Sequence, residues 1–403
     1  MQIMFADSLL IPEIELENRI GKFQSLLKNN DLDGALIVQS ADVVYFCGTY
    51  QNIHLYIPVE GTPIIMVRKN FDRITSDSKL KANIVPLRKM GDILTIIKQH
   101  DLPSPERLGL EMDVLPVSNF QRYQGIFKTS EFIDCSLLIR QLRAVKTHFE
   151  ILRIKETSMM MDNIFNSLPS ILRTGISEFD LVGEIENVAR REGHQGWIRI
   201  RGFNAEFYFG QLLSGTNSAV TSFFDGPING VGMYPEFPFG SGSKIVERDE
   251  PILFDYVGAK SGYMADMTRT YVIGKITNNK YLKSYEAAFE IQQSIIQKAK
   301  PGILSREIYE LSLDIAKKYG LQDNFMGAPP VSFVGHGIGL ELNELPVLAK
   351  GVGAPLEKGM VFAVEPKFTF PHEAGIGLEN TFVMNETGVE KLSNYPDHEI
   401  IKI

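Results

Sequence analysis

Two stretches in the second half of the chain each carry a pair of acidic residues whose types and spacing could bind metal ions. Asp255 follows an apolar, strand-like run, and Asp266 lies on the returning segment after a turn. Glu365 and Glu379 repeat this arrangement later in the chain. If the two stretches pack together, four carboxylates would raise one another's pKa values unless cations neutralise them. Two divalent ions would balance the four charges.

A histidine completes the candidate metal ligands. His336 lies between Gly335 and Gly337, so the backbone can approach closely and the imidazole is free to point at a metal. Four carboxylates and one imidazole suit Mn(II), Fe(II) or Co(II), and Zn(II) is also compatible. Two such ions could share a hydroxide, activate it as a nucleophile and polarise a carbonyl group. Each residue alone is more often a turn, salt-bridge or surface residue, so their matched positions carry the metal hypothesis.

The elements that must position these ligands have the pattern of an internal duplication, with two equivalent halves. Helices predicted to end near Gly175 and Gly302 are 127 positions apart, and each is followed by an amphipathic helix that stops at Gly193 or Gly320. Each half then offers a hairpin with one acid on each arm and a glycine-containing turn. The turn glycines are Gly258 and Gly262 in the first half and Gly375 and Gly377 in the second. A pseudo-two-fold axis between the halves would place equivalent strands side by side.

The N-terminal part of the chain has a different pattern. Residues 15–30 show apolar positions at helical spacing, and short apolar runs follow between turn signals. We expect strands at 35–38, 43–47, 54–59 and 63–67, the last two joined as a hairpin. With 403 residues two domains are the default, and a long helical pattern begins near residue 151. The boundaries are therefore set at 1–140 and 141–403, and the expected fold class is α/β (α+β).

Composition excludes several other functions. The formal net charge is −8 and no run of Lys or Arg occurs, which argues against nucleic-acid binding. Two cysteines cannot form a disulfide framework, the N-terminus lacks the features of a signal peptide, and no apolar run could cross a bilayer. We therefore expect a cytoplasmic protein that binds neither nucleic acid nor membrane.

The sequence resembles the creatinase, prolidase and aminopeptidase P group, relatives of methionine aminopeptidase with the pita-bread fold. The shared features are the Asp255-x10-Asp266 spacing, the sequence Gly335-His336-Gly337-Ile338-Gly339 and the pair Glu365-Pro366. The stretches Asp33–Val38 and Val44–Thr49 resemble the family's N-terminal domain, and Leu138–Lys146 resembles its linker. The resemblance implies an N-terminal mixed α/β creatinase-like domain followed by a duplicated pita-bread metallopeptidase domain.

The resemblance also implies a role for each candidate residue. Asp255 would hold metal one, Asp266 and Glu379 would bridge both metals, and His336 and Glu365 would hold metal two. Glu365 would double as the acid/base that handles the nucleophilic water. The positions expected to bind substrate are Ser222, Asn343, Tyr263 and Arg269. Of the two divalent ions, Mn(II) or Co(II) is favoured, and Zn(II) or Fe(II) is also compatible.

Three positions depart from the family's peptidases. Ser222 and Asn343 lie where histidines are expected, and Gly377 lies where prolidase-like enzymes place an arginine. Misalignment in loops is the alternative explanation. Asn343 could still donate a hydrogen bond to a developing oxyanion, as a catalytic group. His372, between the last two acids, could replace a missing histidine, although a solvated loop histidine is favoured.

An aromatic-rich segment precedes Asp255. The stretch from Gly193 to Asp255 is 17 residues longer than the equivalent stretch from Gly320 to Glu365. Its aromatic residues are Trp197, Phe203, Phe207, Tyr208, Phe209, Phe223, Phe224, Tyr234, Phe237 and Phe239. They could wall a substrate pocket, fill the core or form a dimer contact.

Three functions follow as hypotheses. The first is a metal-dependent Xaa-Pro dipeptidase or aminopeptidase that cleaves a small peptide or amide. The second is a creatinase-like hydrolase or lyase that acts on a small non-peptide substrate, and the third is a non-catalytic binding module. The complete ligand set favours the first hypothesis, and the three departures favour the second. The resemblance further implies a homodimer, because the family's N-terminal domain reaches over a neighbouring active site.

Overall fold

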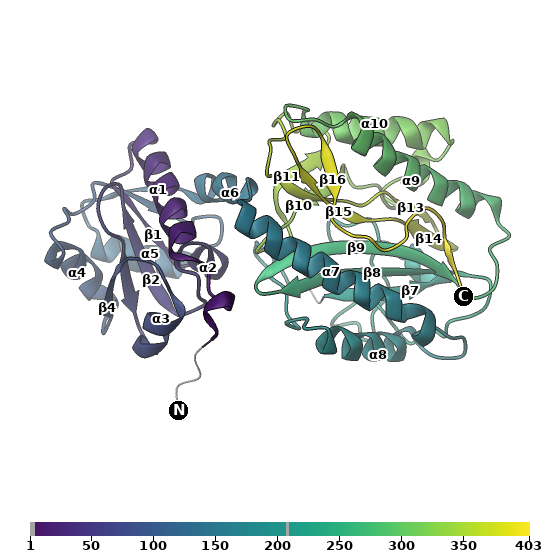
Figure 1. Ribbon diagram of the computed structural model, residues 1–403, viewed down its shortest axis with the longest axis horizontal. Coiled ribbons are helices and arrows are strands. Elements are labelled where there is room, and N and C mark those ends of the chain that lie inside the picture. Colours follow the sequence, from purple (N-terminus) through teal and green to yellow (C-terminus); the bar gives the residue numbers. More distant parts are fainter. Residues whose placement is uncertain (1–4, 207–208) are drawn as a thin grey trace. The chain divides into compact units, whose positions relative to one another are not determined.

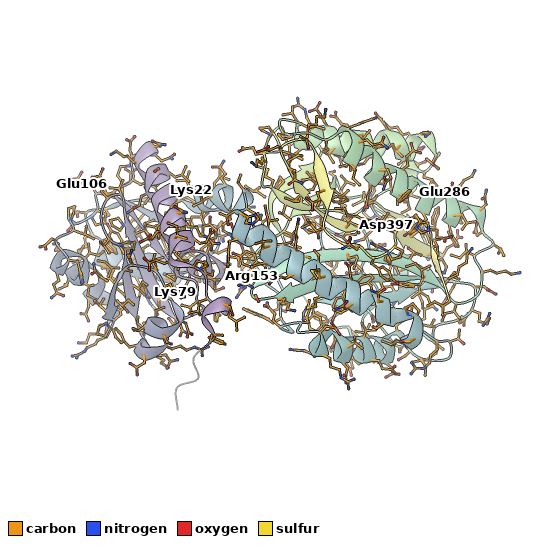
Figure 2. The ribbon with its side chains drawn as sticks, viewed as in Figure 1. Lys22, Lys79, Glu106, Arg153, Glu286 and Asp397 are labelled. Atoms are coloured by element: carbon orange, nitrogen blue, oxygen red, sulfur yellow. The ribbon has the colours of Figure 1, made fainter. Side chains whose placement is uncertain are left out.

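The computed structural model describes residues 5–206 and 209–403 and divides into two units (Figure 1). The first unit comprises residues 1–143 and 201–205, and the second comprises residues 144–200 and 206–403. The expected boundary at 140/141 falls inside helix α6 (Ser136–Ala144). Charged side chains such as Lys22, Glu106 and Glu286 are exposed (Figure 2). None of the helices in the described ranges combines the length and the apolar composition needed to cross a membrane.

The first unit is a six-stranded mixed sheet with helices. The strand order is β4-β3-β2-β1-β5-β6, in which β2 pairs antiparallel with β1 and β3 and the other pairs are parallel. Its strands are β1 (Gly34–Ile37), β2 (Ile53–Pro58), β3 (Ile64–Val67), β4 (Asn83–Pro86), β5 (Arg107–Leu110) and β6 (Glu131–Asp134). Its helices besides α6 are α1 (Glu13–Asn29), α2 (Ser40–Cys47), α3 (Phe71–Asp77), α4 (Ile93–Gln99) and α5 (Val117–Ile126), with short 3-10 turns at Asp7–Leu9 and Met90–Asp92.

One predicted strand of this unit is wrong. Residues 43–47 belong to helix α2, in which every residue from Ala41 to Cys47 is buried. The Gln39 side chain accepts a hydrogen bond from the backbone N–H of Asp42, and Gly48 ends the helix at φ 75°. A short apolar run that is buried on all sides has no periodicity to separate a helix from a strand. These end signals therefore decide the conformation.

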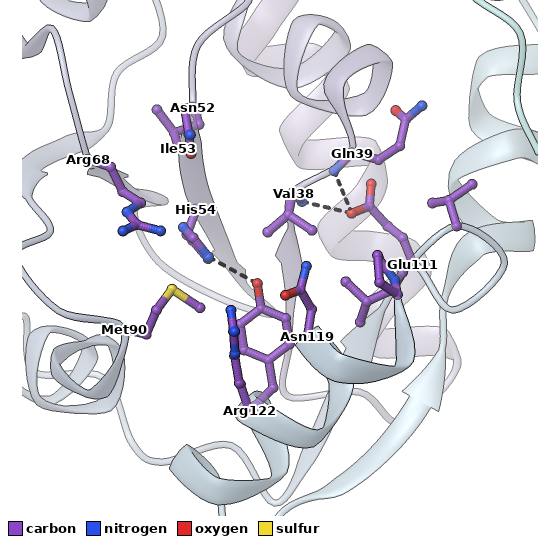
Figure 3. A pocket seen from close by; sticks show the side chains of 14 residues that line it. Val38, Gln39, Asn52, Ile53, His54, Arg68, Met90, Glu111, Asn119 and Arg122 are labelled. Carbon is purple, nitrogen blue, oxygen red and sulfur yellow. Dashed lines mark hydrogen bonds between the residues drawn. The ribbon is translucent and has the colours of Figure 1, made fainter. Parts of the chain in front are cut away.

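A pocket of about 290 Å³ lies in the first unit (Figure 3). His54 Nε2 and the Tyr123 hydroxyl are 3.0 Å apart within its lining. The Glu111 carboxylate accepts hydrogen bonds from the backbone N–H groups of Val38 and Gln39 at 2.7 and 2.9 Å. The pocket's lining contains none of the predicted metal ligands or substrate-binding residues.

The helices of the second unit show the predicted duplication. They are α7 (His148–Ile171), α8 (Glu178–Arg191), α9 (Asn279–Lys298) and α10 (Ser305–Lys318), with 3-10 turns at Gly215–Ala219 and Gln322–Asn324. Both α7 and α9 are followed by a glycine with positive φ, at Gly175 and Gly302, and the same holds after α8 and α10 at Gly193 and Gly320. Only glycine adopts this conformation without a steric cost, which explains the repeated spacing.

Two sheets and a small hairpin carry the site. One sheet has the order β17-β9-β8-β7, the other has the order β11-β10-β12-β15-β16, and β13 pairs with β14. The strands of the first sheet are β7 (Gly210–Ser214), β8 (Pro251–Lys260), β9 (Tyr263–Val272) and β17 (Ile401–Lys402). The remaining strands are β10 (Phe333–Gly337), β11 (Glu344–Ala349), β12 (Val361–Val364), β13 (Lys367–Phe370), β14 (Ala374–Gly377), β15 (Asn380–Met384) and β16 (Val389–Lys391).

The two halves differ in how their acid-bearing arms are connected. In the first half, β8 and β9 form a tight hairpin whose turn, Ser261-Gly262, has positive φ at both positions, as a two-residue hairpin turn requires. In the second half, the β13–β14 hairpin is inserted between β12 and β15. The prediction that Gly375 and Gly377 lie in the turn is therefore wrong, because both belong to β14.

The equivalent strands of the two halves meet as predicted. The backbone N–H of Thr268 donates to the carbonyl of Glu379 at 3.3 Å, and the N–H of Glu379 donates to the carbonyl of Thr268 at 3.1 Å. This exchange joins β9 to the segment that leads into β15. Separate apolar clusters support the two halves, one built on α9, α10 and the second sheet and the other on α7, α8 and the first sheet. The acids therefore lie on strands that are packed against apolar clusters on both sides of the centre.

Candidate metal centre

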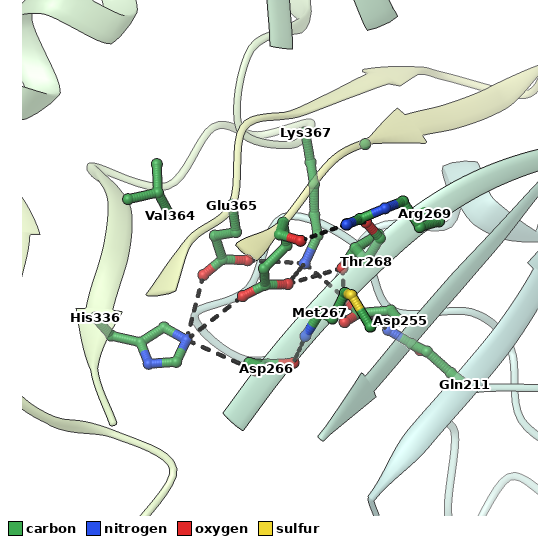
Figure 4. Close-up of polar contacts among 12 residues, drawn as sticks. Gln211, Asp255, Asp266, Met267, Thr268, Arg269, His336, Val364, Glu365 and Lys367 are labelled. Atoms are coloured by element: carbon green, nitrogen blue, oxygen red, sulfur yellow. Dashed lines mark hydrogen bonds and ion pairs between the residues drawn. The ribbon is translucent and has the colours of Figure 1, made fainter. Parts of the chain in front are cut away.

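The five predicted ligands converge on one place in the second unit (Figure 4). Asp255 lies on β8 and Asp266 on the neighbouring strand β9. His336 lies on β10, directly across from Ala363 of β12. Glu365 follows β12 immediately, and Glu379 immediately precedes β15. The sheet register thus brings together residues that are up to 124 positions apart in the sequence.

The geometry around His336 fits a divalent cation. Its Nε2 atom lies 4.0 Å from Asp266 Oδ2, 3.7 Å from Glu365 Oε1 and 4.0 Å from Glu379 Oε1. Ligands bound to one ion at about 2.1 Å in a tetrahedron are about 3.4 Å apart, so a small inward movement would complete the site. Glu379 Oε1 is buried without a hydrogen-bond partner in the described part of the chain. A buried carboxylate oxygen of this kind requires a partner, and a cation can provide it.

A lysine that sequence reasoning did not identify also lies in the centre. Lys367 Nζ donates to Asp255 Oδ2 at 3.0 Å, to Glu365 Oε2 at 2.9 Å and to Glu379 Oε2 at 3.2 Å. Its position two residues after Glu365, at the start of the inserted hairpin, was the available signal. The side chain is almost completely buried. The centre thus contains four carboxylates, one imidazole and one ammonium.

Neighbouring polar groups fix the carboxylates. The Thr268 hydroxyl lies 2.9 Å from Asp255 Oδ1 and 2.7 Å from Glu379 Oε2 and can donate to either oxygen. Gln211 Nε2 donates to Asp255 Oδ2 at 3.3 Å. The backbone N–H of Met267 donates to Asp266 Oδ1 at 2.9 Å, which leaves Oδ2 to face His336. Such supporting contacts orient ligands before an ion binds.

Burial and charge shift the pKa values within the centre. Burial, followed by the charges of Glu379 and Asp255, holds the pKa of Asp266 well above its usual range. Burial raises the pKa of Glu379 to about 8, although the Lys367 ammonium opposes this shift. Burial alone would lower the pKa of Lys367, but the surrounding carboxylates outweigh it and raise the pKa well above the ordinary value. A cluster with these shifts favours bound cations.

Arg269 has a positioning role, and its contacts do not support the expected substrate-binding role. The side chain is fully buried. An arginine has five N–H donors, and here all five are used within the protein. The acceptors are the carbonyl oxygens of Thr268, Glu379, Tyr395 and Pro396 and the Asn380 side-chain oxygen. Arg269 therefore fastens the Glu379 segment to β9 and to the C-terminal region.

The other residues expected to bind substrate lie in different environments. Tyr263 is buried, and its hydroxyl donates to Glu150 Oε1 on α7 at 3.3 Å, so it faces the core and not a substrate. Ser222 is partly buried, and its hydroxyl donates to the carbonyl of Phe224 within the same turn. Asn343 is exposed in the segment between β10 and β11, and His372 is exposed in the β13–β14 turn.

Much of the aromatic segment is exposed. The five exposed side chains are Trp197, Phe203, Phe223, Tyr234 and Phe237. Phe239 is buried, and its ring packs against Phe224 with 5.1 Å between centroids. Phe207 and Tyr208 lie outside the described residues. The core interpretation therefore holds for Phe239 but not for the five exposed residues.

A duplicated α/β unit with carboxylates and an imidazole at its centre is the pita-bread arrangement of metal-dependent hydrolases. Residues 153–386 match the model of metallopeptidase family M24, and residues 19–145 match the creatinase/prolidase N-terminal domain. The chain belongs to metallopeptidase family M24, and it carries the creatinase-like N-terminal domain.

Individual relatives agree with this assignment over nearly the whole chain. An Xaa-Pro dipeptidase of Pyrococcus furiosus is 26% identical over 379 residues, which cover 94% of this chain and 98% of that protein. An Xaa-Pro dipeptidase of Lactobacillus helveticus is 26% identical over 384 residues, with 93% and 96% covered. The structure of an Xaa-Pro dipeptidase from Bacillus anthracis superimposes with a TM-score of 0.82 at 24% identity, covering 96% of this chain and all of that one. The prolidase of Pyrococcus horikoshii OT3 gives a TM-score of 0.80 at 22% identity, with 95% and 100% covered.

Proposed function

We propose that this M24 protein is a metal-dependent hydrolase that cleaves a small peptide or amide bond, as its Xaa-Pro dipeptidase relatives do. The observation that carries the proposal is the position of His336 Nε2 within 4.0 Å of oxygens from three buried carboxylates. All five expected ligands lie in one centre, which argues against a non-catalytic binding module. A bound divalent ion would supply Lewis-acid polarisation and lower the pKa of a water molecule.

The residues of the chain divide the remaining tasks. Glu365 directs Oε1 towards His336 and Oε2 towards Lys367, so it can accept a proton beside the ion and keep it within the centre. Thr268 and Arg269 hold the Glu379 segment in place through its carboxylate and its backbone carbonyl. Asn343 remains our candidate for the group that donates to a developing oxyanion.

The ligand set favours Mn(II) or Co(II), and Zn(II) or Fe(II) would also bind to carboxylates and an imidazole. Sequence reasoning predicted two ions per chain. The geometry around His336 accommodates one of them, and binding of a second depends on Lys367, which contacts Asp255, Glu365 and Glu379.

The substrate is proposed to differ from that of ordinary prolidases. Ser222 and Asn343 cannot supply imidazolium donors, and Gly377 cannot hold a substrate carboxylate as an arginine would. We expect weak or no cleavage of standard Xaa-Pro dipeptides. The residues found at these three positions also favour the second candidate function, a creatinase-like hydrolase or lyase that acts on a small non-peptide substrate.

The first unit is proposed to shape the substrate site in a homodimer and not to bind the metal. The five metal ligands all lie in the second unit, which leaves the first unit a different role. Light scattering at micromolar concentration should give about twice the chain mass of 45.3 kDa. A mass equal to one chain would contradict this proposal. A cytoplasmic location fits the two free, buried cysteines.

The function can be tested with purified protein supplied with Mn(II) or Co(II). The substrates are Xaa-Pro dipeptides, other dipeptides and small non-peptide amides, each followed by mass spectrometry. His336→Ala should abolish turnover, whereas the matched control His372→Ala, in an exposed turn, should retain it. Turnover that is unaffected by His336→Ala or by chelation would refute a metal-dependent hydrolase.

A further inference from the structure

We propose that this chain binds a single divalent cation and that the Lys367 ammonium permanently occupies the second cation position of the centre. The inference deepens the proposed function and rests on the same five ligands. It departs from the two-ion expectation because one of the two positions already contains a positive charge supplied by the chain.

The carboxylates define two cation positions. Glu365 and Glu379 each direct Oε1 towards His336 and Oε2 towards Lys367. The ion position on the His336 side is completed by Asp266 Oδ2. The position on the other side is bounded by Asp255, and Lys367 Nζ lies there at 2.9–3.2 Å from three carboxylate oxygens (Figure 4).

An ion and the ammonium cannot share the second position. A divalent ion would need the oxygens of Asp255 and Glu379 at roughly 2.0–2.2 Å. Lys367 Nζ contacts one oxygen of each, at 3.0 and 3.2 Å. An ion bound to these same oxygens would share them with Nζ and would lie no more than about 5 Å from it, the sum of the two bond distances. Two positive charges this close repel each other strongly in a buried site, where water screens them little.

The surroundings of the lysine stem oppose its withdrawal. Lys367 is only 3% exposed, and it pairs with Gly377 across the β13–β14 hairpin. A Cβ atom at position 377 would lie 2.7 Å from Lys367 Cγ and 3.3 Å from Leu253 Cδ1. The missing side chain at Gly377 thus provides the space through which the lysine stem reaches the carboxylates. Lys367 and Gly377 therefore form a sterically matched pair, because the lysine stem fills the space that a side chain at position 377 would need.

The test is a measurement of metal stoichiometry. Wild-type protein and Lys367→Met are each titrated with Mn(II) by calorimetry, and bound metal is counted by elemental analysis. The methionine keeps the length of the stem but removes the charge. We expect one Mn(II) per chain in the wild type and two in Lys367→Met. Electron paramagnetic resonance should show an isolated Mn(II) signal in the wild type and a spin-coupled pair in the variant.

Two control variants distinguish the effect of removing the Lys367 charge from the effect of a substitution as such. Lys367→Arg keeps a cation and should still bind one Mn(II), and Lys358→Met removes an exposed lysine paired with Glu386 and should also bind one. A wild-type protein that binds two coupled ions would overturn the inference, and so would a folded Lys367→Met protein that still binds one. If Lys367→Met does not fold, the number of Mn(II) ions bound per wild-type chain is sufficient to test the inference. Failure of both proteins to bind any Mn(II) or Co(II) would instead refute the metal dependence in the proposed function.

Discussion

Arg269→Lys tests whether the Glu379 segment depends on a buried guanidinium. Arg269 donates to five oxygen atoms at 2.7–3.1 Å. A lysine ammonium has three donors, so at least two of the five hydrogen bonds must be lost. Hydrogen bonds from a charged group contribute about 1.5–3 kcal/mol each, which gives an expected loss of about 3–6 kcal/mol in the free energy of unfolding. The charge is unchanged, so the loss would report on hydrogen-bond number and geometry.

The assay is urea denaturation followed by circular dichroism and by the fluorescence of Trp197, the single tryptophan, which lies in the second unit. Arg173→Lys serves as the control, because Arg173 pairs with Glu184 on the surface and the unfolding midpoint is expected to stay close to that of the wild type. Affinity for Mn(II) should also fall in Arg269→Lys, since the carbonyl of Glu379 is one of the five acceptors. A loss in unfolding free energy below about 1 kcal/mol would show that this reasoning is wrong.

Three further outcomes are expected. Burial, assisted by the charge of Arg68, lowers the pKa of His54 to about 4. An unfolded histidine titrates near 6.5, so between about pH 6.5 and 4 the unfolded chain binds a proton that the folded protein does not. Up to about 3 kcal/mol of the free energy of unfolding should therefore be lost as the pH falls through that range. Histidine hydrogen–deuterium exchange by mass spectrometry measures this pKa, and a value near 6.5 would contradict the account. Asp42→Asn removes the charged partner of two arginines with buried side chains and should lower the free energy of unfolding in urea by about 3–5 kcal/mol. The control Glu60→Gln, at an exposed ion pair, should leave the unfolding midpoint close to that of the wild type. Gly377→Ala should lower the melting temperature through a loss of about 1–3 kcal/mol, because its methyl group would collide with the Lys367 stem, and an unchanged melting temperature would show that the stem can move aside.

The convergence of the five candidate ligands was predictable because the sequence repeats the acid pairs. Two acid pairs on strand-like segments and a histidine between glycines are visible without coordinates, and the positive-φ glycines after the helices mark the duplication. The pairing of Thr268 with Glu379 confirms that equivalent strands meet. Local sequence was therefore sufficient to predict the candidate ligands and the duplication, because each half carries its own helix ends and its own acid pair.

The remaining features depend on burial and register, which the sequence does not show directly. Lys367 reaches Asp255 only because the β13–β14 hairpin is inserted between the second pair of acids and because Gly377 lies opposite the lysine. Arg269 belongs to a motif that indicated substrate binding, yet its complete burial makes it a positioning residue. Residues 43–47 have strand-forming side chains, but the capping contact of Gln39 begins a helix there.

The short segment Arg201–Ala205 makes the covalent path between the two units unusual. The chain leaves the first unit after Arg143, returns at Arg201 and leaves again after Ala205. Arg201 donates to Asp42 and to Asp113, so a fragment that ends at Arg143 would leave both acids without this guanidinium. A gene fusion or recombination event that exchanges only the N-terminal portion would therefore separate ion-pair partners. A functional exchange of this domain between relatives has to transfer two separate pieces of sequence together.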